Sequence, residues 1–470
     1  MPVGSVAPEL VLLGGSVVVL LYAVFAPRRA QLGAPILAVL ALAVTAGTSW
    51  PMLRGDQALT FFGTYAADDA AVWAKLIVVG ITAVTVALSV EWFRTDPRHG
   101  EYYALLMMSA LGAVLMAGAA DLMELILGVL LASATGYVLA AYHRRSPESG
   151  EAAMKFFLLG ALTNAGMVFG VALLFGLGGS TLFGELRGGL SAADPIALVA
   201  GAGLVVVGVV FKMGAVPAHA WMPDVADGAP APVAAFLTTA PKVGALVLLG
   251  RLALVLPESG VGWRPLVALV AAATMTLGNL AALWQDDVRR LLGWSAVSQS
   301  GYALMAVVAL GRSSLAIPSL LFFLIAYAVA NLAAFGVVIE LRGQAERDRY
   351  GGLAATHPLL ALSLVVAFLS FVGIPPLAGF GAKLALFGAT IDAGYTWLAV
   401  LAVANSVVSL AYYARVLAPA YFVSAPARPL PVLGGWARTG TLVSAAAVIA
   451  LGILAEPLLN GFDVSRLLPG

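Results

Sequence analysis

Apolar runs of about 20 residues recur along the whole chain, with short polar connections between them. Each run is long enough for a helix to cross a hydrocarbon core of about 30 Å, and the alternating pattern of a membrane β-barrel is missing from the sequence. The pattern predicts an all-α polytopic membrane protein with about 14 transmembrane helices. The predicted spans are roughly 8–26, 33–50, 70–92, 101–119, 121–142, 152–177, 195–223, 229–253, 262–284, 288–310, 314–341, 357–391, 395–418 and 437–459.

Two spans, 195–223 and 357–391, are unusually long and contain proline: Pro217 in the first, and Pro375 and Pro376 in the second. Proline removes a helix hydrogen bond, and irregular backbone at membrane depth is tolerated only where it is buried or lines a wet cavity. We therefore predict two broken helices. They cross in opposite directions in this topology, which indicates two inverted repeats.

The chain is predicted to form a single transmembrane domain, residues 1–470, because its loops are short. The repeats would cover about 101–253 and about 262–418, between flanking helices at 8–92 and 437–459. One longer polar connection, 54–69, is predicted to form a small hairpin on one surface.

Composition agrees with a membrane protein. Hydrophobic residues make up 61% and charged residues 10%, whereas a soluble domain is about a quarter charged. The net charge of +1 argues against a nucleic-acid partner. The chain has no cysteine, so it cannot form disulfides or supply thiolate ligands to an iron–sulfur cluster. The first apolar run is followed by Arg28 and Arg29 and is expected to be a retained helix.

The arginines predict how the chain is oriented, because basic loop residues stay on the cytoplasmic side. Fourteen fall on one side of the predicted topology: residues 28, 29, 94, 98, 144, 145, 289, 290, 342, 347, 349, 415, 428 and 438. Six fall on the other: residues 54, 187, 251, 264, 312 and 466. The first side is therefore expected to be cytoplasmic, and an even number of spans places both termini outside, in a bacterial plasma membrane.

The lysines follow a different pattern. All five, Lys75, Lys155, Lys212, Lys242 and Lys383, lie inside apolar segments. Burial disfavours the charged form of lysine, whereas arginine stays charged, so lysine suits the loading and release of a proton. An ionisable side chain at mid-span costs roughly 2.5–3.5 kcal/mol even on the lenient scale, and is a functional candidate by default.

Each lysine also has a structural alternative. Lys75 and Lys155 are near the ends of their spans and could extend to the interface, which is a weaker alternative for Lys212. Lys242 and Lys383 are the stronger functional candidates. His219 follows Lys212 by seven residues, which is two helical turns on the same face. Further polar residues lie in the later spans and could hold water, pass protons or simply bond helices together: Ser295, Ser298, Gln299, Tyr302, Asn331 and His357.

Four long stretches carry a family likeness: "GEAAMKFFLLGAL" (150–162), "VVFKMGAVPAHAWMPDVADGAPAPVAAFLTTAPKVGAL" (209–246), "NLAALWQDDVRRLLGWSAVSQSGYAL" (279–304) and "GIPPLAGFGAKLALF" (373–387). Together they resemble the antiporter-like membrane subunits of respiratory complex I, the proton-translocating NADH–quinone oxidoreductase. The likeness extends over essentially the whole chain and is greatest to the subunit N group.

The resemblance implies a proton-translocating subunit in the membrane arm of an oxidoreductase. By matching motifs, it assigns proton transfer to Lys155, Lys212, Lys242 and Lys383. It implies other membrane-arm subunits as partners in an obligate hetero-oligomer within the lipid bilayer. FMN, iron–sulfur clusters and the quinone site are expected on partner subunits, with no cofactor, metal or redox catalytic site on this chain.

One departure from the family concerns the fifth span. The family usually has a glutamate there, in a stretch like "LGxELLS", that pairs with the seventh-span lysine. Here the stretch is "LGVLLAS", with Leu130 at that position. The nearest carboxylate, Glu124, is six residues earlier, about 9 Å along the helix and some 120° around it. Glu124 is thus a candidate partner for Lys212, although its position also suits an ordinary interfacial glutamate.

Two alternatives therefore stay open. Leu130 is compatible with a structural paralogue that keeps the fold but no longer pumps protons. The fold is also shared with multi-subunit cation/proton antiporters, although the motifs that resemble subunit N count against that group.

Overall fold

The computed structural model describes residues 3–53, 55, 57–96, 99–143, 145–258, 262–424, 430–463 and 467. Helices dominate this part of the chain. The long or broken transmembrane helices are α1 (Ala7–Phe25), α2 (Gly33–Ser49), α3 (Asp69–Ser89), α4 (Gly100–Gly118), α5 (Leu122–Ala140), α6 (Pro147–Gly178), α8 (Pro195–Met213), α9 (Trp221–Gly228), α10 (Ala231–Leu237), α11 (Ala240–Val255), α13 (Trp263–Leu283), α14 (Val288–Ala309), α15 (Ala316–Glu340), α17 (Pro358–Val372), α18 (Ala378–Asp392), α19 (Thr396–Phe422) and α20 (Gly435–Ile453).

Shorter elements connect them. These are helices α7 (Phe183–Leu190), α16 (Leu353–Thr356) and α21 (Ala455–Phe462), and the 3₁₀ turns η1 (Val3–Val6), η2 (Arg28–Ala30), η3 (Trp50–Met52) and η4 (Arg347–Tyr350). The strands β1 (Ala58–Thr60) and β2 (Tyr65–Ala67) pair antiparallel, with Leu59 opposite Ala66. They form the predicted hairpin.

The described residues confirm the predicted all-α polytopic class. Thirteen helices in them are long and apolar enough to cross a membrane, and Pro358–Val372 is a shorter apolar helix. The shorter helix is α17, and together with α18 it forms the remaining predicted span. Five arginines that the orientation prediction used lie outside the described residues: Arg54, Arg98, Arg144, Arg428 and Arg466.

Both predicted helix breaks are present. Helix α8 ends at Met213, where Gly214 has φ 65°, and α9 begins only at Trp221. Helix α17 ends at Val372, where Gly373 has φ 93°, and α18 begins at Ala378. Glycine adopts positive φ without steric cost, so each glycine ends its helix with a left-handed residue, as helices commonly end.

A third break, which the sequence did not reveal, divides the predicted span 229–253. Helix α10 ends at Leu237 and α11 begins at Ala240, with Thr238 and Thr239 between them. The hydroxyl of Thr239 donates to the carbonyl of Ala235 at 2.7 Å. Threonine hydroxyls compete with backbone groups for such carbonyls and often bend helices.

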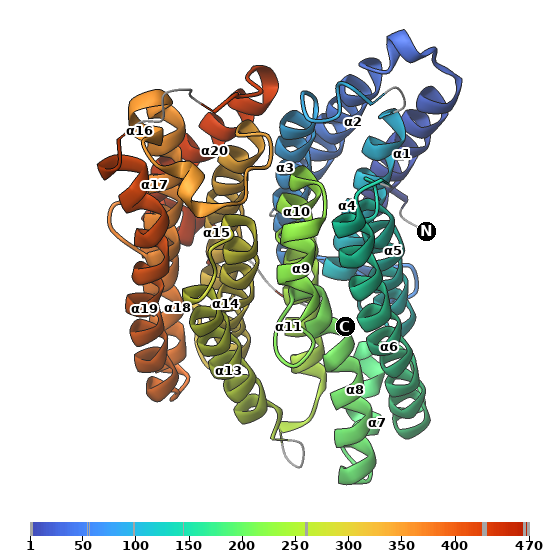
Figure 1. Cartoon of the computed structure of the whole chain (residues 1–470). Coiled ribbons are helices and arrows are strands. Elements are labelled where there is room, and N and C mark those ends of the chain that lie inside the picture. The colour runs from blue at the N-terminus through green and yellow to red at the C-terminus, as the bar shows by residue number, and fades with distance from the viewer. Residues whose placement is uncertain are drawn as a thin grey trace.

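The helices stand roughly parallel in two groups (Figure 1). Helices α13 to α19 lie on the left of this view and α1, α2 and α4 to α8 on the right, with α3, α9, α10 and α11 between them. Every residue of the stretch 231–253 is buried. In contrast, α2, α6 and α19 expose large apolar side chains such as Leu40, Phe169 and Val407, as expected for helices that face lipid.

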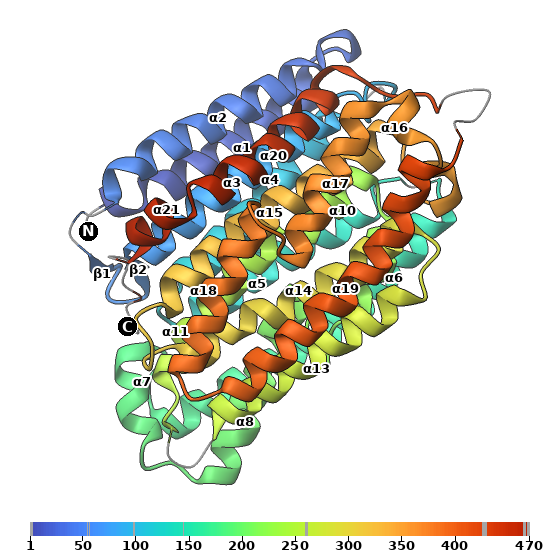
Figure 2. The ribbon, with the colours of Figure 1, turned by 90° about the vertical axis from the view of Figure 1, so that its left-hand side faces the viewer.

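The two ends of the molecule differ. The hairpin, α7 and α21 lie on the left side of Figure 2, and α16 lies at the opposite end, at the upper right. The beginning of α1 is at the hairpin end, because the Tyr65 hydroxyl contacts Glu9. The end of α21 is there too, since Phe462 packs edge-on against Trp73, with ring centroids 4.9 Å apart. The first and last described helices therefore approach the same face.

The orientation prediction counted Arg251 on the outer side, near the end of the predicted span 229–253. Arg251 lies inside α11 and is fully buried. Its two terminal nitrogens contact the carboxylate of Asp68 at 2.6 and 2.7 Å, and its Nε donates to the carbonyl of Ala117. The guanidinium can be buried because its two terminal nitrogens bind both oxygens of one carboxylate, which compensates its charge.

Candidate functional site

Lys212 is the last but one residue of α8, immediately before the first helix break. It is 2% exposed. Its Nζ lies 5.5 to 5.8 Å from the ring centroids of Phe211, Tyr137 and Phe156. Lys212 has no ion pair in the described residues. The faces of these aromatic rings can instead stabilise its ammonium group. Cation–π contacts of this kind contribute about 0.5–2 kcal/mol.

Polar side chains continue from this aromatic pocket into α5 and α6. Asn164 donates to the hydroxyl of Ser133 at 3.1 Å and contacts that of Tyr137 at 3.4 Å. Leu130, where the resemblance implies a glutamate, is 40% exposed.

Lys242 lies in the first turn of α11, directly after the third break. It is 2% exposed. Its Nζ donates to the carbonyl of Ala296 on α14 and to the hydroxyl of Tyr327 on α15, the latter at 3.3 Å. Tyr327 in turn donates to the carbonyl of Thr238 at 2.9 Å. The break therefore exposes a backbone oxygen that holds the tyrosine beside Lys242.

Lys383 lies in α18, after the break between α17 and α18. It is 3% exposed. Its Nζ contacts the Ser406 hydroxyl at 2.9 Å and the Val372 carbonyl at 3.3 Å, and lies 4.0 Å from the Tyr302 ring centroid. Tyr302 and Ser406 hydroxyls are 3.1 Å apart. The carbonyl of Val372 is free to accept because α17 ends there.

Helix α14 connects these three residues, which we call the central lysines. The Ser300 hydroxyl lies within hydrogen-bonding distance of the Met213 carbonyl, next to Lys212, and of the Ala296 carbonyl, 3.1 Å away. Ala296 also accepts from Lys242, and Tyr302 of the same helix lies against Lys383. The central lysines therefore surround one buried, polar helix.

The other polar residues predicted in the later spans are also placed. Ser295 contacts the Tyr413 hydroxyl at 2.5 Å, and Gln299 reaches the Phe371 carbonyl at 3.4 Å. Asn331 donates to the Thr238 hydroxyl at 2.9 Å. Ser298 is buried with no hydrogen-bond partner for its hydroxyl in the described residues, and His357 contacts the Leu430 carbonyl away from the centre.

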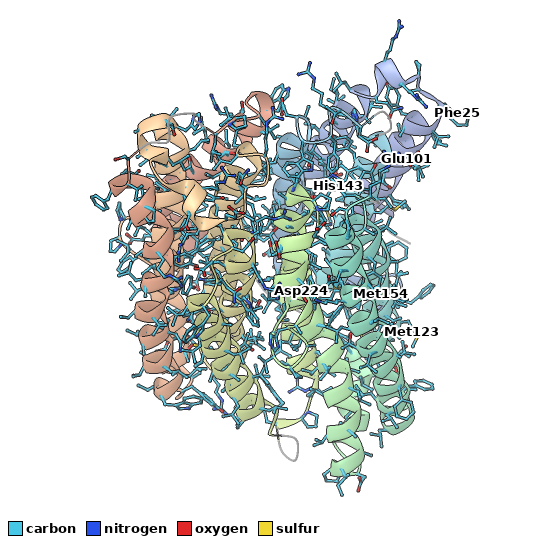
Figure 3. All side chains as sticks on the ribbon, in the orientation of Figure 1. Phe25, Glu101, Met123, His143, Met154 and Asp224 are labelled. Atoms are coloured by element: carbon cyan, nitrogen blue, oxygen red, sulfur yellow. The ribbon has the colours of Figure 1, made fainter. Side chains whose placement is uncertain are left out.

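Lys155 differs from the central lysines because its side chain is 45% exposed. Its Nζ contacts Glu151 at 2.7 Å and Asp224 at 3.1 Å. Asp224 lies on α9, near the middle of the view in Figure 3, and contacts Arg290 at 2.8 Å. Lys155 thus belongs to a charged surface cluster. Its neighbour Phe156 faces Lys212, so the cluster and the buried site adjoin along α6.

The predicted placement of His219 on the helix face of Lys212 is wrong. That prediction assumed a continuous helix, whereas residues 214–220 are not helical. His219 instead packs against Trp294 of α14, with ring centroids 5.7 Å apart. Its Nδ1 is buried without a hydrogen-bond partner in the described part of the chain.

Lys75 and Glu124 are also placed differently from the simplest expectations. Lys75 does not extend to the interface: it is 2% exposed and contacts Glu9 of α1 at 2.5 Å. Glu124 makes no ion pair with Lys212 in the described residues and lines a cavity with Glu9 and Tyr65 near the hairpin. Met123, its neighbour, lies lower on α5 in Figure 3 than His143, which follows the other end of that helix.

Sequence reasoning missed several site residues. Asp224 was visible within "WMPDVADG", but only the fold shows that it contacts both Lys155 and Arg290. Thr238 and Ser406 are ordinary residues for a membrane helix, and nothing in their spacing indicates that they face a lysine. These contacts depend on which helices become neighbours.

Chemically, the central lysines are held by hydroxyls, carbonyls and aromatic rings. Such groups can hold an ammonium ion or a neutral amine without leaving a carboxylate unpaired. The arrangement therefore suits proton transfer more than fixed ion pairing. Among the described residues no cluster of His, Cys, Asp or Glu could hold a metal ion.

Comparison with known proteins places this geometry in a family. A family model described as "NADH:quinone oxidoreductase/Mrp antiporter, TM" matches residues 119–409. The chain is 42% identical over 459 residues to NADH-quinone oxidoreductase subunit N of Mycobacterium sp. (strain JLS), with 96% of each chain covered.

Solved structures give the same result at the level of the fold. A chain of respiratory complex I from Thermus thermophilus has a TM-score of 0.81 at 30% identity, covering 98% of this chain and 100% of that one. A chain of the Mrp complex from Dietzia sp. DQ12-45-1b has a TM-score of 0.86 at 19% identity, covering 98% and 97%. The second likeness shows a shared fold alone.

The resemblance found in the four sequence motifs is therefore confirmed over nearly the full length of the chain. The fold of the chain and its relatives both agree with that resemblance. The chain belongs to the subunit N family of NADH-quinone oxidoreductase, the antiporter-like subunits of the membrane arm of complex I.

Proposed function

We propose that this chain carries protons across the membrane along Lys155, Lys212, Lys242 and Lys383, coupled to quinone reduction in partner subunits. The observation that carries the proposal is that the three central lysines are all buried, all lie beside helix breaks and all adjoin α14. Lys155 and Asp224 would load the path from the arginine-rich face. His219, in the first helix break, would transfer protons between water and this path.

The coupling is electrostatic. Charge moved onto one lysine changes the proton affinity of the next, because interactions between charges are strong where burial lowers the dielectric. Release would then follow through Lys383. Moving each elementary charge against 100 mV costs about 2.3 kcal/mol, so net pumping requires an energy source outside this chain.

We infer that redox chemistry in partner subunits is that source. FMN, iron–sulfur clusters and the quinone site would lie on those subunits, and this chain would carry no cofactor, metal or redox catalytic site. It would work as part of an obligate hetero-oligomer with the other membrane-arm subunits, surrounded by lipid. Both termini would face the outside of a bacterial plasma membrane, and nucleic acid would not be a partner.

One observation favours a second candidate, a structural paralogue that no longer pumps. Lys212 has no carboxylate contact in the described residues, and Leu130 stands where the family has glutamate. Burial without a counter-charge favours the neutral form of lysine, which would interrupt the path at this step. A cation/proton antiporter is supported only by the shared fold.

The test is Lys242→Met in the intact complex, reconstituted into vesicles. Methionine keeps much of the side-chain volume but cannot carry a proton. We expect quinone-coupled proton transport to be lost while the complex still assembles and the partner subunits remain present. Val247→Met, at a buried position of the same helix, is the control for introducing a methionine into α11.

The outcomes separate the candidates. Normal proton transport by Lys242→Met would contradict the proposal. A wild-type complex that transports no protons with this chain present and assembled would favour the structural paralogue. Sodium-dependent proton flux by the chain without a redox partner would favour an antiporter.

A further inference from the structure

A second cluster of ionisable side chains lies apart from the central lysines, at the hairpin end of the molecule. Lys75 of α3 contacts Glu9 Oε1 of α1 at 2.5 Å. The Tyr65 hydroxyl of β2 donates to the same oxygen, also at 2.5 Å. The Lys75 and Glu9 side chains are only 2% and 7% exposed. The other oxygen, Glu9 Oε2, is buried without a hydrogen-bond partner in the described residues.

Glu9 lines a cavity of about 280 Å³. Thr64, Tyr65 and Glu124 line it with polar groups, and the remaining wall is apolar, from α1, α4 and Phe61. A water molecule occupies about 30 Å³ of liquid, so the cavity has room for several. The unpartnered oxygen of Glu9 and the carboxylate of Glu124 therefore share a space that water can fill.

The charges around this cavity do not balance. Glu9 and Glu124 bring two carboxylates, and Lys75 brings one ammonium group. The other nearby charges are already engaged: Asp121 caps α5 by accepting from the Met123 and Glu124 amides, and Asp68 pairs with Arg251. Unbalanced negative charge beside a mostly apolar cavity is costly, and binding one proton reduces it. Burial and then Glu9 hold the pKa of Tyr65 well above its usual range, so Tyr65 stays a hydrogen-bond donor.

We propose that Glu9, Glu124, Lys75 and Tyr65 form a second proton-exchange site, additional to release through Lys383, between the membrane interior and the outer aqueous phase. Water in the cavity delivers or removes the proton, which binds to a carboxylate oxygen of Glu9 or Glu124. Among the described contacts, Lys75 and Tyr65 bind Glu9 and not Glu124. The inference rests on the proposed function and on the outward orientation of the hairpin face.

A purely structural role is the competing explanation, because the Lys75–Glu9 pair also joins α1 to α3. Glu124 separates the two explanations, since it lines the cavity without belonging to that pair. Glu124→Gln keeps the shape and polarity but cannot exchange a proton. Glu9→Gln keeps acceptors for Tyr65 and Lys75. Glu185→Gln, an exposed position in α7 near the same surface, is the matched control.

The experiment uses the intact complex in vesicles, with proton transport per quinone reduced measured against the pH of the outer-face compartment. For the wild type, we expect transport to fall as that pH falls, because the site cannot release its proton into an acidic phase. Glu124→Gln and Glu9→Gln should reduce transport and flatten this dependence, with quinone reduction in uncoupled vesicles unchanged. Glu185→Gln should match the wild type.

Wild-type transport and an unchanged pH dependence in assembled Glu124→Gln and Glu9→Gln complexes would overturn the inference. If Glu9→Gln impairs assembly, Glu124→Gln alone decides. Lys242→Met is measured in parallel. If that variant loses transport while Glu124→Gln does not, only the exchange site is refuted, and normal transport by Lys242→Met refutes the proposed function itself.

Discussion

Buried cations are accommodated in two ways in this chain. Lys242 and Lys383 contact carbonyl and hydroxyl oxygens, and Lys212 contacts aromatic rings. Arg251 instead contacts the carboxylate of Asp68 with both terminal nitrogens, and both side chains are fully buried. The first arrangement leaves no opposite charge behind when a proton departs. The second is a permanent pair, which suits a structural joint.

Asp68→Asn should therefore destabilise the protein strongly. Removing one partner of a buried ion pair typically costs about 3–5 kcal/mol, because the other charge stays buried without compensation. Asp68 also caps α3 through the Ala71 amide, but asparagine caps as well as aspartate, so capping should survive. We expect a lower yield of assembled complex and a lower thermal unfolding midpoint.

Asp194→Asn is the matched control for that experiment. Asp194 caps α8 by accepting from the Ile196 and Ala197 amides and is exposed, and it has no ion pair in the described residues. The same chemical change there should leave the unfolding midpoint nearly unchanged. Equal effects of the two substitutions would show that the Asp68–Arg251 pair is not a structural joint.

At the scale of the element, the three helix breaks show which structural features could be predicted from the sequence and which could not. Pro217, Pro375 and Pro376 interrupt apolar runs visibly, so two breaks and their lysines could be located. The third break is made by Thr238 and Thr239, whose hydroxyls bond the preceding turn, and threonine is common in membrane helices. His219 was misplaced although a break at Pro217 was expected, because helical spacing holds only while the helix continues.

The approach of α18 to α17 gives an element-scale prediction. An added Cβ at Gly379 would lie 1.7 Å from the carbonyl oxygen of Ser370, and the Gly379 amide donates to the Ser370 hydroxyl at 3.0 Å. Gly379→Ala must therefore move α18, which carries Lys383 one turn later. Overpacking of this kind costs typically about 1–3 kcal/mol. We expect impaired assembly, or an assembled complex with reduced proton transport.

Gly388→Ala tests whether that effect is specific to the contact. Gly388 is in the same helix, and an added Cβ there would lie 3.6 Å from Leu315, an ordinary contact. Replacing a helical glycine with alanine generally stabilises by about 0.5–1 kcal/mol. Complex yield and proton transport should therefore equal or exceed the wild type. A normal Gly379→Ala variant would refute the role given to this helix contact.

At the scale of the whole molecule, the lengths of the apolar runs predicted the spans, because each must match the bilayer, but several ends differ: α6 is Pro147–Gly178 where 152–177 was predicted. Helix neighbours were not predictable, because membrane helices associate through shape and polar contacts that give little periodic signal. Glu9 and Lys75 illustrate this limit: they are 66 positions apart yet in contact. Orientation depends on the bilayer itself, so it needs a measurement in the membrane.

The natural absence of cysteine makes that measurement direct. Ser191→Cys would place one thiol in the exposed connection between α7 and α8, at the hairpin end, and Asp348→Cys one in η4, where the side chain is 88% exposed, at the opposite end. A charged, membrane-impermeant maleimide is added to intact cells before the tagged chain is purified. Because arginine-rich connections stay cytoplasmic, Ser191→Cys should be labelled in intact cells and Asp348→Cys only after permeabilisation.

The reverse pattern would place the hairpin face in the cytoplasm, so the Glu9–Glu124 cavity would have to serve proton uptake instead of release.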